Sequence, residues 1–487
     1  MMYLYTDSLE QELQAILDSI EGLSAAVTLK PLADRDVTEN HLLFKNGQVH
    51  VPLPWDHTSP PIMFEPIDFV PEDLIAIILT QLGYEQEALT YCRNKELAES
   101  IQCGLQLLSP DHSFQIEVSD QGYVSLHNHA VLGHFTSHLY NGLPPETRYE
   151  LALEQVSSEE CSAFTIRQYA VLLLDRGHYA KAEQLIRTAL EQSLPENATN
   201  YLTLDLINVL LASAISDREE IKLLIDRALQ YFLKQQTIWV IADLHARASE
   251  VAHQEKQYSE SLGHITKAIQ YYEELGIAEF LAAAFIRKGT LLYTWAQEGQ
   301  TQFYQAAIDT YQEALKTFTR EEVPQVYAEI HHNLAVIYAE MPMDEKKKAM
   351  WAAFSATSFK ESLELYRKDA YPYEYAMVAN NYANALLRYP AAKLGDNTEK
   401  AIHYYLEAME IRTAEAFPVE RAHTLLNYLE ACWRIHNINK TMERARYRDM
   451  LDKAKEVISL TNDQTLIDQA QAHMDQLLEL GVAILKD

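Results

Sequence analysis

The sequence predicts a mainly α-helical protein built from tandem helix pairs, an α-solenoid, and three observations lead to this. The 487 residues include only 14 glycines and 16 prolines, a balance that favours long helices with short connections. Small residues return at intervals of 39 to 48 residues along a series of amphipathic segments. In each segment a larger apolar residue stands between two small positions on one helical face, which is the pattern that close helix packing requires.

The repeated pattern is a triplet of positions, in which the first lies seven residues and the second three residues before the last. The first position is small in five of six segments, so neighbouring helices can approach each other there while the middle side chain fills the remaining gap. The six triplets are Ala182, Ile186 and Ala189; Ile221, Ile225 and Ala228; Ser261, Ile265 and Ala268; Ala307, Tyr311 and Ala314; Ser355, Phe359 and Ser362; and Ala401, Tyr405 and Ala408.

One unit, QYAVLLLDRGHYAKAEQLIRTAL at 168–190, has Tyr169 at a first-helix packing position, Gly177 at the turn and Ala182 in the second helix. This unit resembles the tetratricopeptide repeat (TPR), and the resemblance covers about residues 160–460. Insertions between the two helices lengthen the later units to a period near 47 residues, against 34 in the family. The long-period units look like the TPR arrays that accompany bacterial caspase-like or signalling modules. The resemblance implies a right-handed α-solenoid that binds a partner polypeptide segment in its concave groove.

The last three units share a motif in which proline is followed by alanine four residues later and by asparagine five residues after that. Asparagine is a mediocre helix former, so its return at one position calls for a role. In TPR proteins this position looks into the groove, and asparagine there is similar to a residue that grips the main chain of a bound peptide. The resemblance therefore implies peptide binding by Asn333, Asn381 and Asn427. The alternative is that these side chains join neighbouring repeats.

Further polar residues share the inferred groove-facing positions, namely Asn380, Arg247, Arg287, Arg388 and Arg434. Because arginine pairs bidentately with carboxylates, they predict a ligand segment that is acidic or that ends in a carboxylate. The alternative is that the arginines form salt bridges within the chain.

The formal net charge is −30, and residues 1–150 hold 6 Lys and Arg against 22 Asp and Glu. This charge disfavours nucleic acid and anionic membranes as partners. The four cysteines, Cys92, Cys103, Cys161 and Cys432, form no CxxC pair, which is typical of reduced thiols. With no secretory signal and no long apolar segment visible, we expect a cytoplasmic protein.

Residues 1–158 differ from the repeats and predict an acidic cap with a small α/β character. After it we expect an array of about six helix pairs at 159–460 and a capping helix at 461–487. Within the cap the expected elements are a helix at 6–20 capped by Thr6 or Asp7, a hairpin at 41–55 turning at Asn46–Gly47, a helix pair at 71–92, a helix at 95–108, and a second hairpin at 113–129.

The cap also holds the one cluster that could bind metal, consisting of His112, His127, His129, His134 and His138. His134 and His138 would share a helix face and His127 and His129 a strand face, although uncommitted histidines are the commoner explanation. No nucleotide-binding, hydrolase or kinase motif is present. We therefore expect no catalysis, no cofactor and no resident metal, and a scaffold that binds a partner protein. The alternative is a peptide- or ligand-controlled sensor whose N-terminal domain gates the groove.

Overall fold

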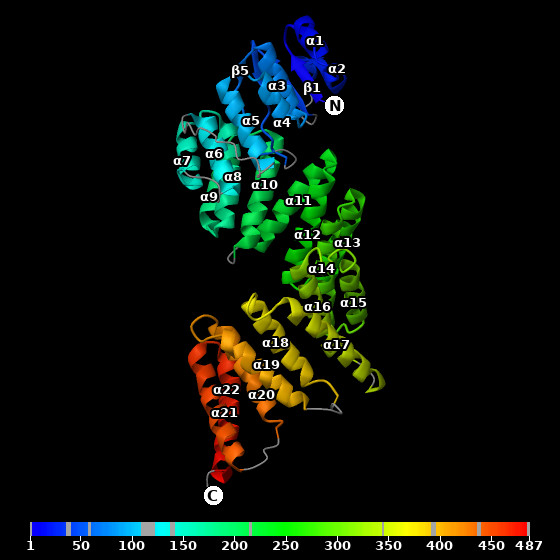
Figure 1. Ribbon diagram of the computed structural model, residues 1–487, viewed down its shortest axis with the longest axis vertical. Helices are drawn as coiled ribbons and strands as arrows, with labels where there is room; N and C mark the ends of the chain where they lie inside the picture. Colours follow the sequence, from blue (N-terminus) through cyan, green and yellow to red (C-terminus); the bar gives the residue numbers. More distant parts are fainter. Residues whose placement is uncertain are drawn as a thin grey trace. The chain divides into compact units, whose positions relative to one another are not determined.

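The computed structural model describes residues 2–35, 40–56, 60–108, 122–136, 142–213, 217–342, 345–390, 396–435 and 440–484. They divide into two compact units, Met1–Thr237 and Ile238–Asp487, called here the first and second unit. The predicted fold class is confirmed, since the described residues form a mainly helical chain of tandem helix pairs with one small sheet (Figure 1). Within these residues, no helix combines the length and the apolar character that crossing a bilayer requires.

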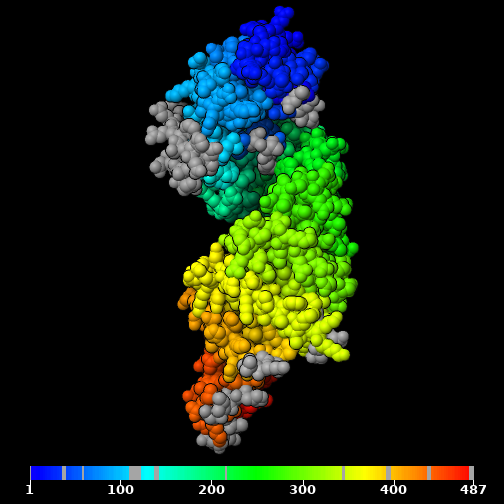
Figure 2. All heavy atoms as spheres, turned by 45° about the vertical axis from the view of Figure 1, so that its right-hand side comes forward, coloured from blue at the N-terminus to red at the C-terminus, as the bar shows by residue number. Residues whose placement is uncertain are grey.

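The first unit begins with a five-stranded sheet in the order β2-β1-β3-β4-β5. Strand β1 is parallel to β2 and β3, whereas β3, β4 and β5 are antiparallel neighbours. The strands are β1 (Met2–Thr6), β2 (Val27–Pro31), β3 (His41–Lys45), β4 (Gln48–His50) and β5 (Ile67–Asp68), and the helices beside them are α1 (Glu10–Asp18), α2 (Leu23–Ala26), the short 3-10 helix η1 (Leu32–Asp34), α3 (Pro71–Gln81), α4 (Glu85–Tyr91) and α5 (Lys95–Leu108). Figure 2 shows the atoms of this region gathered at the blue end of the chain.

Two expectations for the start of the chain are corrected. The helix expected at 6–20 begins only at Glu10, and Thr6 ends strand β1, whose side chains Met2 and Leu4 are fully buried. Neither Thr6 nor Asp7 caps α1, because Leu9 occupies that position and no side chain bonds to the helix start. The Thr6 hydroxyl instead accepts a hydrogen bond from the Ser8 N–H at 3.1 Å.

The hairpin turn at Asn46–Gly47 is confirmed, and both residues have positive φ, 54° and 77°, as a type I′ turn requires. Its second strand is shorter than expected and ends at His50, since Pro52 and Pro54 have no N–H for a sheet ladder. The predicted helix pair at 71–92 corresponds to α3 and α4, and the helix predicted at 95–108 is α5.

The second predicted hairpin, at 113–129, is wrong for the residues that the structure describes. Residues from 123 onwards form helix α6 (Tyr123–Phe135), which starts after Gly122, and residues 113–121 lie outside the described part. His127, Asn128 and His129 are all buried polar residues, so they break the apolar stripe that would have identified a helix.

Three further helix pairs complete the first unit, and the second unit continues the same arrangement. In the first unit they are α6 with α7 (Pro145–Gln155), α8 (Glu159–Asp175) with α9 (Tyr179–Leu190), and α10 (Glu196–Ala212) with α11 (Arg218–Gln235). In the second unit they are α12 (Ile238–Gln254) with α13 (Tyr258–Leu275), α14 (Ala278–Gln297) with α15 (Phe303–Ala314), α16 (Pro324–Glu340) with α17 (Glu345–Leu365), α18 (Pro372–Leu386) with α19 (Asn397–Ile411), and α20 (Pro418–Cys432) with α21 (Lys440–Leu460), followed by α22 (Gln464–Ile484).

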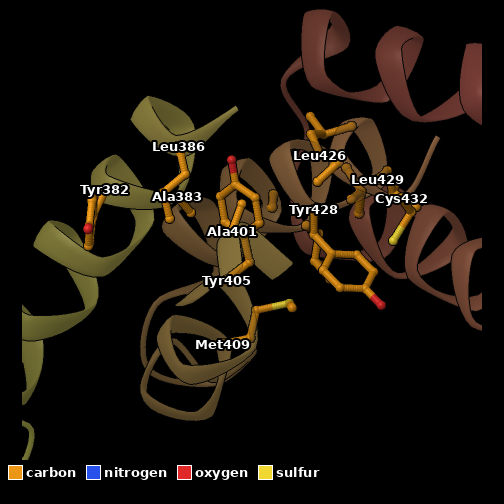
Figure 3. Packing of buried hydrophobic residues seen from close by; sticks show 14 of the residues in the cluster. Tyr382, Ala383, Leu386, Ala401, Tyr405, Met409, Leu426, Tyr428, Leu429 and Cys432 are labelled. Atoms are coloured by element: carbon orange, nitrogen blue, oxygen red, sulfur yellow. The ribbon is translucent and has the colours of Figure 1, made fainter. Parts of the chain in front are cut away.

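All eighteen positions of the six predicted triplets are buried, none more than 2% exposed. Figure 3 shows two positions of the last triplet, where Ala401 and Tyr405 of α19 lie between Ala383 of α18 and Leu429 of α20. The triplets are therefore the inner face of each second helix, and they hold the first helices of successive pairs together. First helices also contact one another directly, as α8 contacts α10 and α16 contacts α18.

Helices α6 and α7 form a helix pair inside the region predicted as the cap. Asn128 of α6 lies 40 residues before Gln168 of α8. This separation is close to the 39 and 40 residues that separate the first three triplets. The helix expected at the C-terminal end of the chain corresponds to α22. The boundaries 1–158, 159–460 and 461–487, and the capping roles, stay predictions.

Candidate functional site

Helices α16, α18 and α20 carry the predicted asparagines at the same position counted from the start of each helix. Each helix begins with the proline of its motif at the first turn, where a missing N–H costs no hydrogen bond. Asn333, Asn381 and Asn427 are consequently the tenth residue of their helices. The three side chains thus occupy equivalent positions on neighbouring first helices of the second unit.

Four side chains, here called the amide row, join these helices through a chain of hydrogen bonds. They are His332, Asn381, Asn380 and Asn427. The Asn381 side-chain nitrogen lies 2.9 Å from His332 Nε2, and the Asn427 side-chain nitrogen donates to the Asn380 oxygen at 3.3 Å. Asn380 closes the chain by donating to the Asn381 oxygen at 3.2 Å. Burial lowers the pKa of His332 to about 4, so its neutral ring accepts the Asn381 bond at Nε2.

Asn381 and Asn427 both bond to a neighbouring repeat in the amide row, as the alternative describes. Peptide binding by these two residues stays a prediction. Asn333 is different. Its side chain is half-buried, and no hydrogen bond joins it to another described residue. An amide carries both donors and an acceptor, so Asn333 can pair with the C=O and the N–H of an extended chain.

Two of the predicted arginines are bonded between repeats within the described residues. Arg388 Nη1 donates to Glu340 Oε1 at 2.8 Å, and the Tyr293 hydroxyl donates to the other oxygen of Glu340 at 2.5 Å. Arg434 Nη1 donates to the main-chain oxygen of Leu387, also at 2.8 Å. These contacts span 47 or 48 residues and so reproduce the repeat period.

The other two arginines have carboxylate partners on first helices. Arg247 Nε lies 2.6 Å from Asp243 one turn earlier in α12, and Arg287 Nη1 lies 3.8 Å from Glu250 across the α12–α14 contact. Pairs this exposed contribute at most about 1 kcal/mol each. Arg247, Arg287 and Arg388 thus have the carboxylate partners of the intramolecular alternative, whereas Arg434 bonds to a main-chain oxygen. Selectivity for an acidic segment stays a prediction.

A small cavity of about 70 Å³ adjoins Arg388 at the ends of α16 and α18. Tyr338, Trp351 and Tyr389 line it. The Trp351 indole nitrogen is buried and has no hydrogen-bond acceptor among the described residues, which is a costly state for an N–H group. The cavity therefore has an aromatic wall and an unused donor.

In the first unit, an asparagine on a first helix holds a segment of the chain itself that forms neither helix nor strand. The Asn128 oxygen accepts from the Met63 N–H at 2.8 Å, and its nitrogen donates to the Met63 carbonyl at 2.9 Å. A third bond, from the Asn128 nitrogen to Ser100 Oγ at 3.1 Å, fixes the amide against α5. The amide orientation is unambiguous, since its oxygen meets a donor and its nitrogen two acceptors.

Two further first-helix side chains bond to main-chain oxygens of the same segment. His127 Nε2 lies 3.2 Å from the Pro61 carbonyl, which can only accept, so this nitrogen carries the proton. Arg167 of α8 donates to the Trp55 carbonyl and also pairs with Asp205 of α10 at 2.9 Å. Burial lowers the pKa of His127 to about 4, which keeps this ring neutral.

The histidine cluster does not form as expected in the part of the chain that the structure describes. His127 and His129 lie on a helix, not on a strand, and His134 Nε2 is 2.8 Å from Asp175. His112 and His138 lie outside the described residues. Among the described residues, no group of three His, Cys, Asp or Glu side chains is arranged to hold a metal ion.

Sequence reasoning missed His332 and Asn128 as parts of these sites. His332 directly precedes Asn333, and only the bond to Asn381 distinguishes it from a core histidine. Asn128 was placed in a hairpin, although its separation of 40 residues from Gln168 was a usable signal. The five prolines between residues 52 and 66 were a further signal of a segment that forms neither helix nor strand.

No protein-family model matches the chain. No curated protein matches it either. Among solved structures, it is similar to a human IFIT1 dimer with m7Gppp-AAAA, with 13% identity, 84% of this chain and 90% of the other covered, and a TM-score of 0.44. It is also similar to yeast Tom70, with 14% identity, 82% of each chain covered and a TM-score of 0.39. The P58(IPK) TPR domain has 13% identity, coverage of 85% and 99%, and a TM-score of 0.25.

Proposed function

We propose that this protein is a non-catalytic scaffold that binds an extended segment of a partner polypeptide along the first helices of its second unit. Asn333 is the central ligand-binding residue of this site. It pairs with the main chain of the partner, while the amide row holds α16, α18 and α20 in register beside it. The cavity lined by Trp351 receives one partner side chain or a terminal carboxylate.

One observation carries the proposal, the two-way hydrogen bonding of Asn128 to Met63. It is an example, within this chain, of a first-helix asparagine holding the main chain of another segment. Asn333 has the same side chain on a first helix, and in the described residues its bonding capacity is unused. An amide that binds main-chain groups tolerates many ligand sequences, as a scaffold requires.

Site-specific photo-crosslinking in the source cell tests this function. One full-length variant has a photoreactive phenylalanine analogue in place of Asn333, and the matched control has it in place of Gln305, an exposed amide on second helix α15. We expect a discrete crosslinked polypeptide at position 333 that is absent at 305. Crosslinks of equal yield at the two positions, or crosslinks to nucleic acid instead of protein, would overturn the proposal.

A further inference from the structure

The segment between strands β4 and β5, residues 51–66, is here called the strap. It contacts α6 and α8, two helices that come much later in the sequence. Residues 57–59 of the strap lie outside the described part. The described residues 51–56 and 60–66 form no helix or strand, and a connection of this length usually has a function of its own. The strap holds five prolines, Pro52, Pro54, Pro60, Pro61 and Pro66. Its backbone makes tight turns at Pro54 and Pro61, where the Trp55 N–H donates to the Leu53 carbonyl at 2.9 Å and the Ile62 N–H donates to the Pro60 carbonyl at 2.7 Å.

The strap is held mainly through its backbone, as a bound peptide is. Asn128 pairs with both main-chain groups of Met63, His127 bonds to the Pro61 carbonyl, and Arg167 bonds to the Trp55 carbonyl. None of these bonds depends on the strap's side chains. They come from α6 and α8, the first helices of two consecutive pairs.

Three side chains of the strap act as anchors. Trp55, Ile62 and Met63 are 3%, 3% and 1% exposed, whereas the other described strap residues are half-buried or exposed. The Trp55 ring meets Phe164 edge-on at 5.2 Å, and its indole N–H donates to Glu160 at 3.1 Å. A few fully buried anchors among less buried residues are typical of a bound peptide.

The sheet does not depend on the strap for its closure. Strands β4 and β5 pair directly at the base of the strap, with Gln48 opposite Asp68 and Val49 opposite Ile67. The pairing of β4 with β5 therefore does not pass through the strap, although Val51 and Phe64 near its ends pack against the hydrophobic core of the sheet. When the strap leaves, the burial of its three anchor side chains and its four backbone hydrogen bonds are lost. A partner segment with similar anchor residues can form the same contacts in its place.

We propose that the face formed by α6 and α8 is a second peptide-binding surface, which residues 51–56 and 60–66 occupy in cis. Its ligand is a partner segment with a tryptophan preceded by proline and, several residues later, a pair of apolar residues preceded by proline. This segment competes with the strap for Asn128 and Arg167. The inference deepens the proposed scaffold function, but it concerns the first unit and is tested independently of Asn333.

A labelled synthetic peptide of residues 51–66 is the probe, and fluorescence anisotropy with full-length protein is the measurement. Trp55→Ala loosens the resident strap, so we expect this variant to bind the peptide at least tenfold more tightly than wild type. Adding Asn128→Ala to Trp55→Ala should reverse the gain, while adding Asn333→Ala should leave it unchanged. Circular dichroism checks that each variant is folded.

Wild-type protein provides a second measurement that needs no destabilising change. The peptide with a photoreactive leucine in place of Ile62 should crosslink, on long incubation, to the tryptic fragment that contains Asn128. The same peptide with Trp55→Ala should not. Absence of the Asn128 crosslink in wild type, together with equal peptide affinity of the wild-type and Trp55→Ala proteins, overturns the inference and shows the strap to be a permanent part of the fold.

Discussion

A buried ion pair between Arg167 and Asp205 connects two first helices of the array, α8 and α10. Arg167 is 1% exposed and Asp205 5%, and they pair at 2.9 Å between α8 and α10. Breaking a buried pair is costly, because the remaining ion keeps its desolvation penalty without its partner. Arg167 also holds the Trp55 carbonyl, so this pair connects the helix packing to the strap.

Asp205→Ala is expected to destabilise the first unit by about 3–5 kcal/mol, since it removes the Asp205 carboxylate from the buried Arg167 charge. The matched control is Glu220→Ala, which removes one of the two carboxylates paired with the half-exposed Arg187, each at 2.8 Å, and should cost at most about 1 kcal/mol. Hydrogen-exchange mass spectrometry of α8 and α10 in both variants measures the difference. Equal effects of the two changes would contradict the buried role of Arg167 and Asp205.

At the scale of elements, local patterns could be predicted from the sequence and long-range bonds could not. The triplets of the second helices were readable because spacing along a helix fixes which residues share a face. Helix α6 was missed because its buried His127, Asn128 and His129 imitate the polar positions of a strand. The bond from Asn128 to Met63 spans 65 residues, and no local pattern reports it.

The site asparagines illustrate the same limit. Their shared position in three helices was predicted correctly. Their partners depend on distances of about 3 Å across the helix contacts, and an amide can serve a neighbouring repeat or a ligand equally well. Composition and spacing therefore identify the candidate residues, but they cannot distinguish Asn333 from Asn381.

Gly289 of α14 provides a test of the helix packing. A Cβ at this position would lie 2.9 Å from the Tyr311 ring of α15, the middle residue of a buried triplet. Gly289→Ala should therefore destabilise the second unit by about 1–3 kcal/mol despite the better helix propensity of alanine. Gly263→Ala on α13, where a Cβ meets no atom within 4 Å, should instead stabilise by up to about 1 kcal/mol. Thermal unfolding of both variants checks this, and two shifts of the same sign would contradict the close α14–α15 contact.

At the scale of the whole molecule, buried neutral histidines link stability to pH in both units. Burial lowers the pKa of His127 in the first unit, and of His245 and His332 in the second, to about 4. Their unfolded-state pKa is near 6.5, so the unfolded chain binds protons more readily. Stability is therefore fully present above pH 6.5 and is lost as the pH falls from 6.5 towards 4.

The melting temperature should accordingly decrease as the pH is lowered from 7 to 5. In His332→Gln, the melting temperature of the second unit should decrease less over this range than in wild type. Glutamine offers an oxygen in place of Nε2 for the Asn381 bond but binds no proton in this range. His403→Gln, at a side chain that is 67% exposed, is the control and should leave the slope as in wild type. Calorimetry across this pH range measures the slope of melting temperature against pH. Identical slopes for both variants would exclude His332 as a source of the pH dependence.

The central claim is that asparagines on first helices hold the main chain of another segment, and Asn128 allows the most direct test. The measurement is residue-resolved hydrogen exchange of the Met63 N–H in wild type and in Asn128→Ala, with the α6 amides as the internal reference. Losing the acceptor of a buried N–H removes about 1–3 kcal/mol, so Met63 should exchange at least about tenfold faster while α6 stays unchanged. Unchanged protection of Met63, or an acceleration shared equally by α6, would contradict the claim.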